Sequence, residues 1–168
     1  MNDKVHVTLE PLPVDALDGL AATLREARLP HADLCADLGT TSKHFFCAFV
    51  GDMNVGYVGL EIAGPEALLR SAVIFMRARG HGYGRQMVER LLAIAAEQHI
   101  RRIWLLTESA PGFFAKLGFR DADRRSVPAA IAATEEFVSL CPPGAACMLH
   151  ELPVVGADAT AVEPHPAT

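Results

Sequence analysis

The chain has 168 residues, of which 51% are hydrophobic and 21% are charged, a balance typical of one soluble globular domain with a sizeable core. Its formal net charge of −5 argues against a general nucleic-acid-binding protein. No apolar run approaches the roughly 18 residues of a membrane-spanning helix, and the first residues lack the order of a signal peptide, so we expect a cytoplasmic protein without a membrane partner.

The N-terminal part of the sequence predicts helices followed by a β-hairpin. Apolar residues recur at helical spacing over 14–28, and 31–39 predicts a second short helix that ends at a glycine. Two apolar runs, 44–50 and 55–62, lie on either side of a Gly-Asp-Met-Asn turn. Runs of this length around a turn are typical of paired antiparallel strands.

The centre of the chain predicts a strand, a loop, a helix and another strand. A nearly continuous apolar run at 67–75 indicates a strand that is buried on both faces. The glycine-rich stretch 79–84 follows it. An apolar stripe along 85–99 then predicts an amphipathic helix, and 102–107 predicts the next strand.

The C-terminal part predicts two more helices and a last strand. The helices are expected over 111–117 and 127–140, with a short strand between them, and the final strand over 146–152. This order predicts a mixed α/β sheet with helices on both faces, folded as a single domain over 1–152. The Pro/Ala-rich residues 153–168 are expected to form a C-terminal tail.

Charge and cysteine content narrow the kind of ligand. Between Arg70 and Arg102, seven arginines stand against two acidic residues, a local balance of +5 that leaves about −10 for the rest of the chain. A basic segment in an acidic chain suits one compact anionic ligand. The four cysteines form no Cys-x-x-Cys pair, so we expect reduced thiols and no metal site.

The glycines of the Arg-Gly-His-Gly-Tyr-Gly stretch lie where a strand passes into a helix. The first N–H groups of a helix have no partner within it, and the helix dipole favours an anion there. Glycine lets the backbone approach such an anion closely. The spacing excludes a Walker A loop, which needs a lysine, and a dinucleotide-binding Gly-x-Gly-x-x-Gly loop.

Two segments carry a resemblance to a known family. The pattern Arg79-x-x-Gly82-x-Gly84, between a strand and an amphipathic helix, resembles the pyrophosphate loop of the GCN5-related N-acetyltransferases (GNAT). The segment Gly-Phe-Phe-Ala-Lys-Leu-Gly-Phe at 112–119 is similar to the family's Phe-Tyr-x-Lys-x-Gly-Phe segment beside the thiol end of coenzyme A. The resemblance covers about 5–152. It implies a GNAT-like fold with an extra helix between the last strands, and acetyl-CoA as the co-substrate.

The resemblance also implies where the cofactor lies. The preceding strand would bind the pantetheine arm through its backbone, and its N–H groups around Val73 and Ile74 would stabilise the oxyanion of the reacting carbonyl. The residues that the resemblance assigns to the cofactor are Ala72, Val73, Ile74, Arg79, Gly80, His81, Gly82, Tyr83, Gly84, Arg85, Thr107 and Phe114.

Acetyl transfer in this family usually occurs directly, without an acyl-enzyme, and it needs a base for the acceptor amine. We expect Glu61 to be this base, because it lies among apolar residues at the end of a predicted strand, a setting that tunes carboxylates for proton transfer. The alternative is a structural acid that pairs with Arg70. Arg70 itself could hold a substrate anion bidentately or pair internally with Glu61. We expect Phe46 to lie on the acceptor side, and His44 and His31 either to line the acceptor pocket or to be surface histidines.

Phe114 departs from the family pattern. A tyrosine commonly stands at this position and protonates the leaving thiolate, whereas phenylalanine has no proton to give. Either the thiolate leaves without help, which its modest basicity permits, or another group protonates it. A protein that has lost its activity is the third reading.

Further stretches resemble bacterial GNAT proteins associated with arsenic-resistance genes. They include 127–140 with the following Cys-Pro, and Cys147 beyond it. The implied substrate is the amine of a small acidic amino acid such as phosphinothricin or its arsenic counterpart arsinothricin. The alternatives are a non-catalytic GNAT-fold sensor that binds acetyl-CoA, or trivalent arsenic through Cys141 and Cys147, and an enzyme that acetylates a protein tail. A homodimer is expected from the resemblance.

Overall fold

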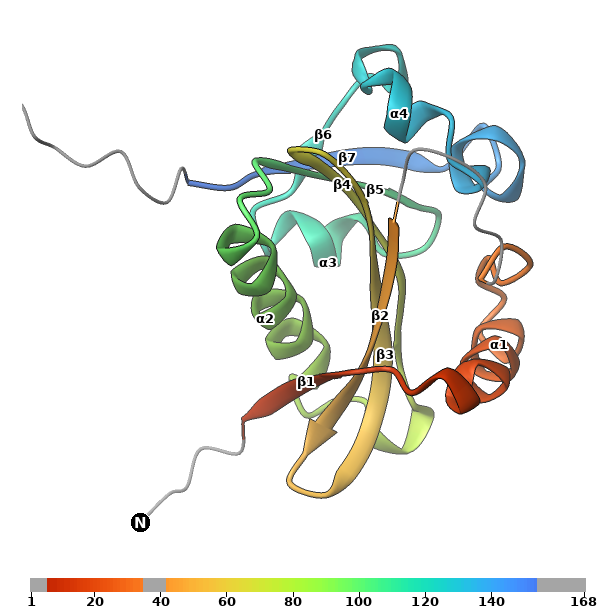
Figure 1. Cartoon of the computed structure of the whole chain (residues 1–168), viewed down its shortest axis with the longest axis vertical. Coiled ribbons are helices and arrows are strands. Elements are labelled where there is room, and N and C mark those ends of the chain that lie inside the picture. The colour runs from red at the N-terminus through yellow and green to blue at the C-terminus, as the bar shows by residue number, and fades with distance from the viewer. Residues whose placement is uncertain (1–5, 35–41, 154–168) are drawn as a thin grey trace, which may run out of the picture.

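The computed structural model describes residues 6–34 and 42–153, and every structural statement below concerns these residues. A seven-stranded mixed sheet runs through the molecule with helices on both faces (Figure 1). The strands are β1 (Val7–Pro11), β2 (Ser42–Val50), β3 (Met53–Ala63), β4 (Glu66–Ile74), β5 (Arg102–Thr107), β6 (Arg120–Asp121) and β7 (Ala146–Glu151). The α-helices are α1 (Leu17–Glu26), α2 (Tyr83–Glu97), α3 (Pro111–Ala115) and α4 (Ala129–Ala132). Within these ranges, no helix has the length and apolar character to cross a membrane.

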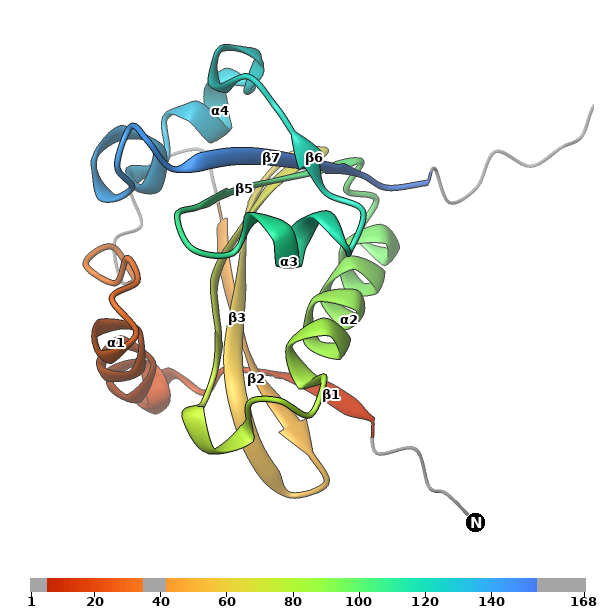
Figure 2. The same cartoon turned by 180° about the vertical axis from the view of Figure 1, so that it is seen from behind.

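The sheet contains one parallel strand pair, and this pair is incomplete. The strand order is β1-β2-β3-β4-β5-β7-β6, and all neighbours are antiparallel except β4 and β5. These two strands pair only from Glu66 opposite Arg102 to Leu68 opposite Trp104. Beyond Leu68 they diverge, so that β5 and β7 cross the direction of β3 and β4 (Figure 2). The sheet is therefore closed at the start of β4 and open at its end.

A β-bulge in β4 explains why the strands part. The pairing of β3 with β4 shifts register between Tyr57 and Gly59, and Ser71 in β4 has a positive φ of 57°. A bulge bends its strand and increases the local twist. At the closed end, the Trp104 Nε1–H donates to Glu66 Oε2 at 2.8 Å, which ties the two strands together.

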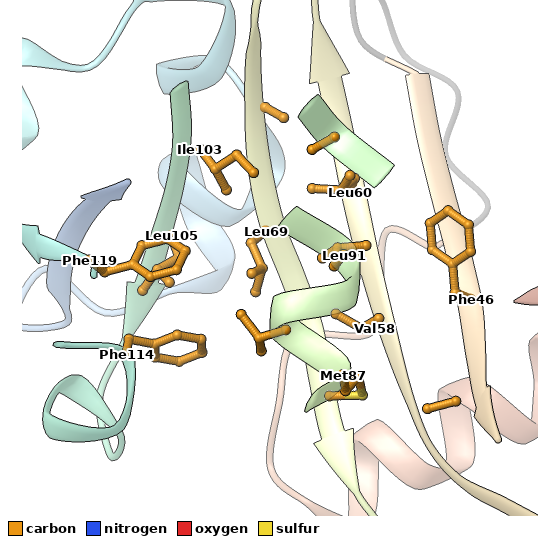
Figure 3. Close-up of a cluster of buried hydrophobic side chains, with 14 of the residues drawn as sticks. Phe46, Val58, Leu60, Leu69, Met87, Leu91, Ile103, Leu105, Phe114 and Phe119 are labelled. Atoms are coloured by element: carbon orange, nitrogen blue, oxygen red, sulfur yellow. The ribbon is translucent and has the colours of Figure 1, made fainter. Parts of the chain in front are cut away.

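Two helices cover opposite faces of the sheet. α2 packs on one face through the main hydrophobic core, part of which is labelled in Figure 3. The labelled residues are Phe46, Val58, Leu60, Leu69, Met87, Leu91, Ile103, Leu105, Phe114 and Phe119. α1 covers the other face with Leu20 and Leu24, both fully buried against Tyr57 and Val73. Burial of large apolar side chains contributes roughly 1.5–3 kcal/mol each, so both helices are held mainly by their apolar faces.

The predicted mixed α/β sheet is confirmed, together with the hairpin, the strand at 67–75 and the helix at 85–99. The sequence also contains β1, which we did not predict. Its alternation of Val7 and Leu9 with polar residues is a strand signal, but it is short and lies at the sheet edge. The predicted helix at 31–39 lies largely outside the described residues, and the tail at 153–168 lies outside them except for its first residue.

The prediction of one continuous helix over 127–140 was wrong. The segment contains the short helix α4 and then a separate π-helical turn, Glu136–Leu140, in which the Cys141 N–H donates to the Glu136 carbonyl at 3.0 Å. The Thr134 hydroxyl donates to the Ile131 carbonyl between the two pieces. The apolar periodicity indicated a helix, but it could not show that Glu136 is turned inward to a buried ion cluster.

Candidate active site

The first cavity lies on the α2 face, between the end of β4, the glycine loop, α2 and α3. It has a volume of about 550 Å³, and we call it the α2-side cavity. Its walls include every residue that the resemblance assigned to the cofactor, except His81 and Thr107. Phe113 and Phe114 of α3 also line it, and the Phe113 ring lies next to Gly84 at the start of α2. The structure therefore brings the predicted strand, loop and aromatic segment together around one space.

Residues of the glycine loop line this cavity where the loop passes into the first turn of α2. Gly80 and Gly82 have φ angles of 80° and 76°, a region that favours glycine, and Gly82 is the N-cap residue of α2. The first helical hydrogen bond runs from the Gln86 N–H to the Gly82 carbonyl, so the N–H groups of the first turn have no partner within the helix. A Cβ at Gly82 would meet no protein atom within 4 Å. The space beside it is open to a ligand.

The end of β4 offers a further backbone donor. The Phe75 N–H donates to the Val55 carbonyl, and Val73 is paired with Tyr57, so Ile74 between them points its N–H and carbonyl away from β3. This side faces the gap where β5 has diverged. The Arg79 Nε–H donates to the Ile74 carbonyl at 3.1 Å.

Two more cavities lie on the α1 side of the sheet. The β4-end cavity, about 580 Å³, lies between α1 and the end of β4, and it shares Val73, Ile74 and Arg79 with the α2-side cavity. The α1-side cavity, about 660 Å³, is lined by 27–32, 106–109 and parts of 140–145, and it shares Ala27 with the β4-end cavity. The end of β4 is thus the place where spaces on the two faces meet.

A buried ion cluster lies beside the α1-side cavity. Arg70 Nη1 donates to Asp33 Oδ2 at 2.6 Å and to Glu61 Oε2 at 2.8 Å, and Arg70 Nη2 donates to Asp33 Oδ1. Arg70 Nε lies 3.5 Å from Glu136 Oε1. Lys43 Nζ lies 3.2 Å from Asp33 Oδ2. The Arg70 side chain is fully enclosed, and the three carboxylates are 4% exposed or less.

Burial and charge act in opposite directions on this cluster. Burial raises the pKa of Asp33, but the hydrogen bonds and charge of Arg70 and the charge of Lys43 outweigh it and hold this pKa below its ordinary value. Burial raises the pKa of Glu136 to about 7, although Arg70 partly offsets the rise. Burial also raises the pKa of Cys141 to about 11, so Cys141 is a protonated thiol at neutral pH.

The pair between Arg70 and Glu61, the alternative for both residues, is present in the structure. Neither side chain lines any of the three cavities. The roles of Glu61 as a base and of Arg70 as a substrate ligand therefore stay predictions. Sequence reasoning missed Asp33 and Glu136, although an arginine in an apolar strand signals that buried carboxylates must lie nearby.

The remaining predicted acceptor residues are dispersed. His44 is exposed on β2, and Phe46 is buried in the main core under α2, so neither borders the three cavities. His31, by contrast, lines the α1-side cavity, and its Nδ1 lies 3.0 Å from the Leu29 carbonyl. Thr107 also lines this cavity, and its hydroxyl accepts from the Ala110 N–H at 3.1 Å.

His81 and Phe114 complete the set of predicted cofactor residues. The His81 ring stacks on the ring of Tyr83 with centroids 5.4 Å apart. Tyr83 lines the α2-side cavity, but His81 does not. Phe114 is 7% exposed and packs edge-on against Phe113 and Phe119 while it lines the cavity. It is a core residue and a cavity wall at once.

The cysteines lie in different surroundings. Cys141 lines the α1-side cavity, whereas Cys147 on β7 is buried in a cluster with Trp104 and Leu68. Cys47, Cys141 and Cys147 are all free thiols. Within 6–34 and 42–153, no group of three or more His, Cys, Asp or Glu side chains is arranged to hold a metal ion.

Comparisons with known proteins agree with this geometry. The model of the acetyltransferase (GNAT) family matches residues 15–119, more than half of the chain, and the chain therefore belongs to this family. Members are N-acetyltransferases that use acetyl-CoA as co-substrate. No curated protein is similar enough in sequence to count as a relative.

Solved structures share the fold at low sequence identity. N-acetylglutamate synthase from Neisseria gonorrhoeae, complexed with coenzyme A and L-arginine, matches with a TM-score of 0.70 and 16% identity over 89% of this chain. The chain spans only 34% of the length of that synthase. A Mycobacterium tuberculosis protein in complex with CoA and NLQ matches with a TM-score of 0.67 and 20% identity, over 86% of this chain and 99% of that one. The ribosomal-protein-S18-alanine N-acetyltransferase from Escherichia coli matches with a TM-score of 0.62 and 17% identity, over 90% and 97%.

Proposed function

We propose that this chain transfers an acetyl group from acetyl-CoA directly to the amine of a small amino compound. The observation that carries the proposal is the meeting of two cavities at the end of β4. The α2-side cavity and the β4-end cavity lie on opposite faces of the sheet and share Val73 and Ile74. A donor on one face and an acceptor on the other can therefore meet at one backbone position.

The donor fits the α2-side cavity by charge and by shape. The pyrophosphate of acetyl-CoA would bind the N–H groups at the start of α2, next to Gly80 and Gly82, where the helix dipole favours an anion. The pantetheine arm would then lie along β4, in the gap left by β5. Arg79 and Arg85 both line this cavity, so both can complement the phosphate charge. Arg85 is exposed and also pairs with Glu89 at 2.7 Å.

The chemistry needs few protein groups. The neutral amine attacks the acetyl carbonyl carbon, and the Ile74 N–H stabilises the oxyanion that forms. The carbon–sulfur bond then breaks, the coenzyme A thiolate leaves, and the amine nitrogen gives up a proton. Phe114 cannot protonate the thiolate, so we propose that it departs unassisted, which the basicity of a thiolate permits.

Two side chains are candidates for the base. Glu61 stays a prediction, but its carboxylate accepts from Arg70 and is 2% exposed. His31 lines the α1-side cavity directly. Since its Nδ1 faces the Leu29 carbonyl, Nδ1 carries the proton of the neutral ring and Nε2 holds the lone pair. We propose His31 as the second candidate.

The acceptor is proposed to be an acidic, oxyanion-bearing amino acid such as phosphinothricin or arsinothricin, in the context of arsenic resistance. The resemblance over 127–140 and beyond supports this class. Arg28 borders the α1-side cavity together with Glu108, and Arg77 and Arg79 border the β4-end cavity together with Glu26, so basic residues outnumber acidic ones only in the second. A cytoplasmic location and a homodimer stay predictions.

The second candidate function is a sensor without catalysis. Phe114, in the place of a proton-donating tyrosine, favours it. Such a sensor would bind acetyl-CoA, or trivalent arsenic through Cys141 and Cys147. The different surroundings of these two thiols, one in a cavity wall and one in the core, weigh against the arsenic site.

A thiol-release assay with acetyl-CoA and a panel of amino acids, including phosphinothricin and arsinothricin, tests the proposal. We expect thiol release that depends on the amine, together with an acetylated product detected by mass spectrometry. Tight acetyl-CoA binding without turnover on any amine would favour the sensor. A chain that neither binds acetyl-CoA nor turns over would contradict both functions.

A further inference from the structure

We propose that Arg70 is a positioning residue for acetyl transfer, which holds the two walls of the α1-side cavity in the arrangement that the acceptor needs. This inference rests on the proposed function, because it takes the α1-side cavity as part of the acceptor site. It assigns to Arg70 an indirect role in place of direct contact with the substrate.

The first step is the set of segments that Arg70 joins. Its guanidinium donates to Asp33 on the segment after α1 and to Glu61 on β3, and it faces Glu136 in the π-helical turn. Lys43 on β2 adds a second link, since its Nζ donates to the Asp33 carbonyl at 2.7 Å. Residues far apart in the sequence are thus fastened to one side chain of β4.

The second step is the position of these partners beside the cavity. Asp33 directly follows Ala32, the last residue of the first wall. Glu136 lies four residues before Leu140, the first residue of the opposite wall, within the turn that leads to it. One wall is therefore anchored to Arg70 by a bidentate pair, and the other is held only by the contact between Glu136 Oε1 and Arg70 Nε at 3.5 Å.

The third step links the cluster to the reacting end of β4. Arg70 immediately precedes the bulge residue Ser71, and Ile74 follows it by four positions in the same strand. Gly59, opposite Arg70, makes room for this arrangement, because a Cβ there would lie 2.7 Å from the Phe45 ring. The acceptor walls are thereby fixed relative to the strand that would bind the acetyl group.

The fourth step is the balance of charge. The cluster contains three carboxylates and two cations. The charges of Arg70, Asp33, Glu61 and Lys43 act on Glu136, and the charge of Glu136 acts in turn on the Cys141 thiol. In the described residues, Arg70 Nε finds no hydrogen-bond partner, so Glu136 is the least firmly held member. Its raised pKa, about 7, means that ionisation adds a charge that the site disfavours. The second wall should loosen as the pH rises through neutrality.

The test uses the full chain with Arg70→Lys and Glu136→Gln, and with Glu135→Gln as the matched control on the same turn. In Arg70→Lys we expect the KM for the acceptor to rise about tenfold or more, with the Kd for acetyl-CoA within about twofold of the wild type. In Glu136→Gln we expect the acceptor KM, expressed as the concentration of the neutral amine, to lose the rise between pH 6 and pH 8.5 that the wild type and Glu135→Gln share.

Hydrogen–deuterium exchange separates this inference from the proposed function, because it needs no turnover. We expect faster exchange over 27–32 and 140–145 in Arg70→Lys, with exchange in α2 unchanged. Unchanged exchange in both walls would overturn the positioning role even if the enzyme is active. Equal loss of acceptor and acetyl-CoA binding would also overturn it. If Arg70→Lys does not fold, the same exchange comparison is made between Asp33→Asn, which weakens the bidentate pair with Arg70, and the wild type. Faster exchange is expected over 27–32, and no difference would overturn the role.

Discussion

The two faces of the sheet are built in different ways. The α2-side cavity takes most of its walls from one continuous stretch, from the end of β4 through the glycine loop into α2. The α1-side cavity takes its walls from 27–32, 106–109 and parts of 140–145, three segments that are far apart in the sequence. Under the proposed function, the donor site is built by local backbone geometry, whereas the acceptor site is assembled from distant parts of the chain.

The local construction of the α2-side cavity predicts the largest effect. Gly82→Trp should weaken acetyl-CoA binding by on the order of 1,000-fold, about 4 kcal/mol, because the side chain would strain the positive φ and fill the space beside the helix N-terminus. Isothermal titration calorimetry measures this. Gly64→Trp is the control, since Gly64 also has a positive φ in open space but lies in the β3–β4 turn. Equal loss of affinity in both variants would contradict the loop assignment.

On the α1 side, the buried Glu136 predicts that the stability of the protein depends on pH. Unfolded Glu136 loses its proton near pH 4.5 and folded Glu136 near 7, so between these values the folded state binds more protons and stability falls as the pH rises. The difference corresponds to about 3 kcal/mol. Glu136→Gln removes this titration.

Chemical denaturation at pH 5 and pH 8 measures the effect. The free energy of unfolding of Glu136→Gln minus that of the wild type should be higher at pH 8 than at pH 5, by up to about 3 kcal/mol. Glu135→Gln, whose carboxylate accepts only from the exposed Ser139 hydroxyl among the bonds described, should show little of this change. A constant difference at both pH values would show that Glu136 does not titrate in this range.

The identity of the base is a further test, because the two candidates lie in different places. His31 lines the α1-side cavity, whereas Glu61 lies in the buried ion cluster. His31→Asn keeps a donor toward the Leu29 carbonyl but loses the basic nitrogen, and it should lower kcat about 100-fold if His31 is the base. Glu61→Gln should instead lower kcat mainly at lower pH if Glu61 is the base. His44→Asn, at an exposed position away from the cavities, is the control. Steady-state rates from pH 6 to pH 9 distinguish these outcomes.

Phe114 predicts the smallest effect. If the thiolate leaves unassisted, Phe114→Tyr should change kcat by less than about threefold, because the added hydroxyl supplies a proton that the reaction does not need. The same variant reports on packing, since Phe114 contacts Phe113 and Phe119. A rise in kcat of more than about tenfold would show that protonation of the thiolate limits the native enzyme.

The sequence by itself determined the parts of this protein that depend on neighbouring residues. The hairpin, the amphipathic α2 and the glycine loop follow from periodicity and from the conformations that glycine allows. The α2-side cavity could therefore be predicted from Gly80, Gly82 and their surroundings. Only the tertiary structure decided the bulge at Ser71 and the break in 127–140.

The tertiary structure also decided the partners of Arg70. An isolated arginine in an apolar strand signals that partners exist, but two of its three carboxylates, Asp33 and Glu136, lie 37 and 66 positions away along the chain. The local sequence around each of them predicts only a polar residue near a turn or helix. Burial makes the pairing obligatory, because an unpaired charge in the interior is costly, and burial arises only when the chain has folded.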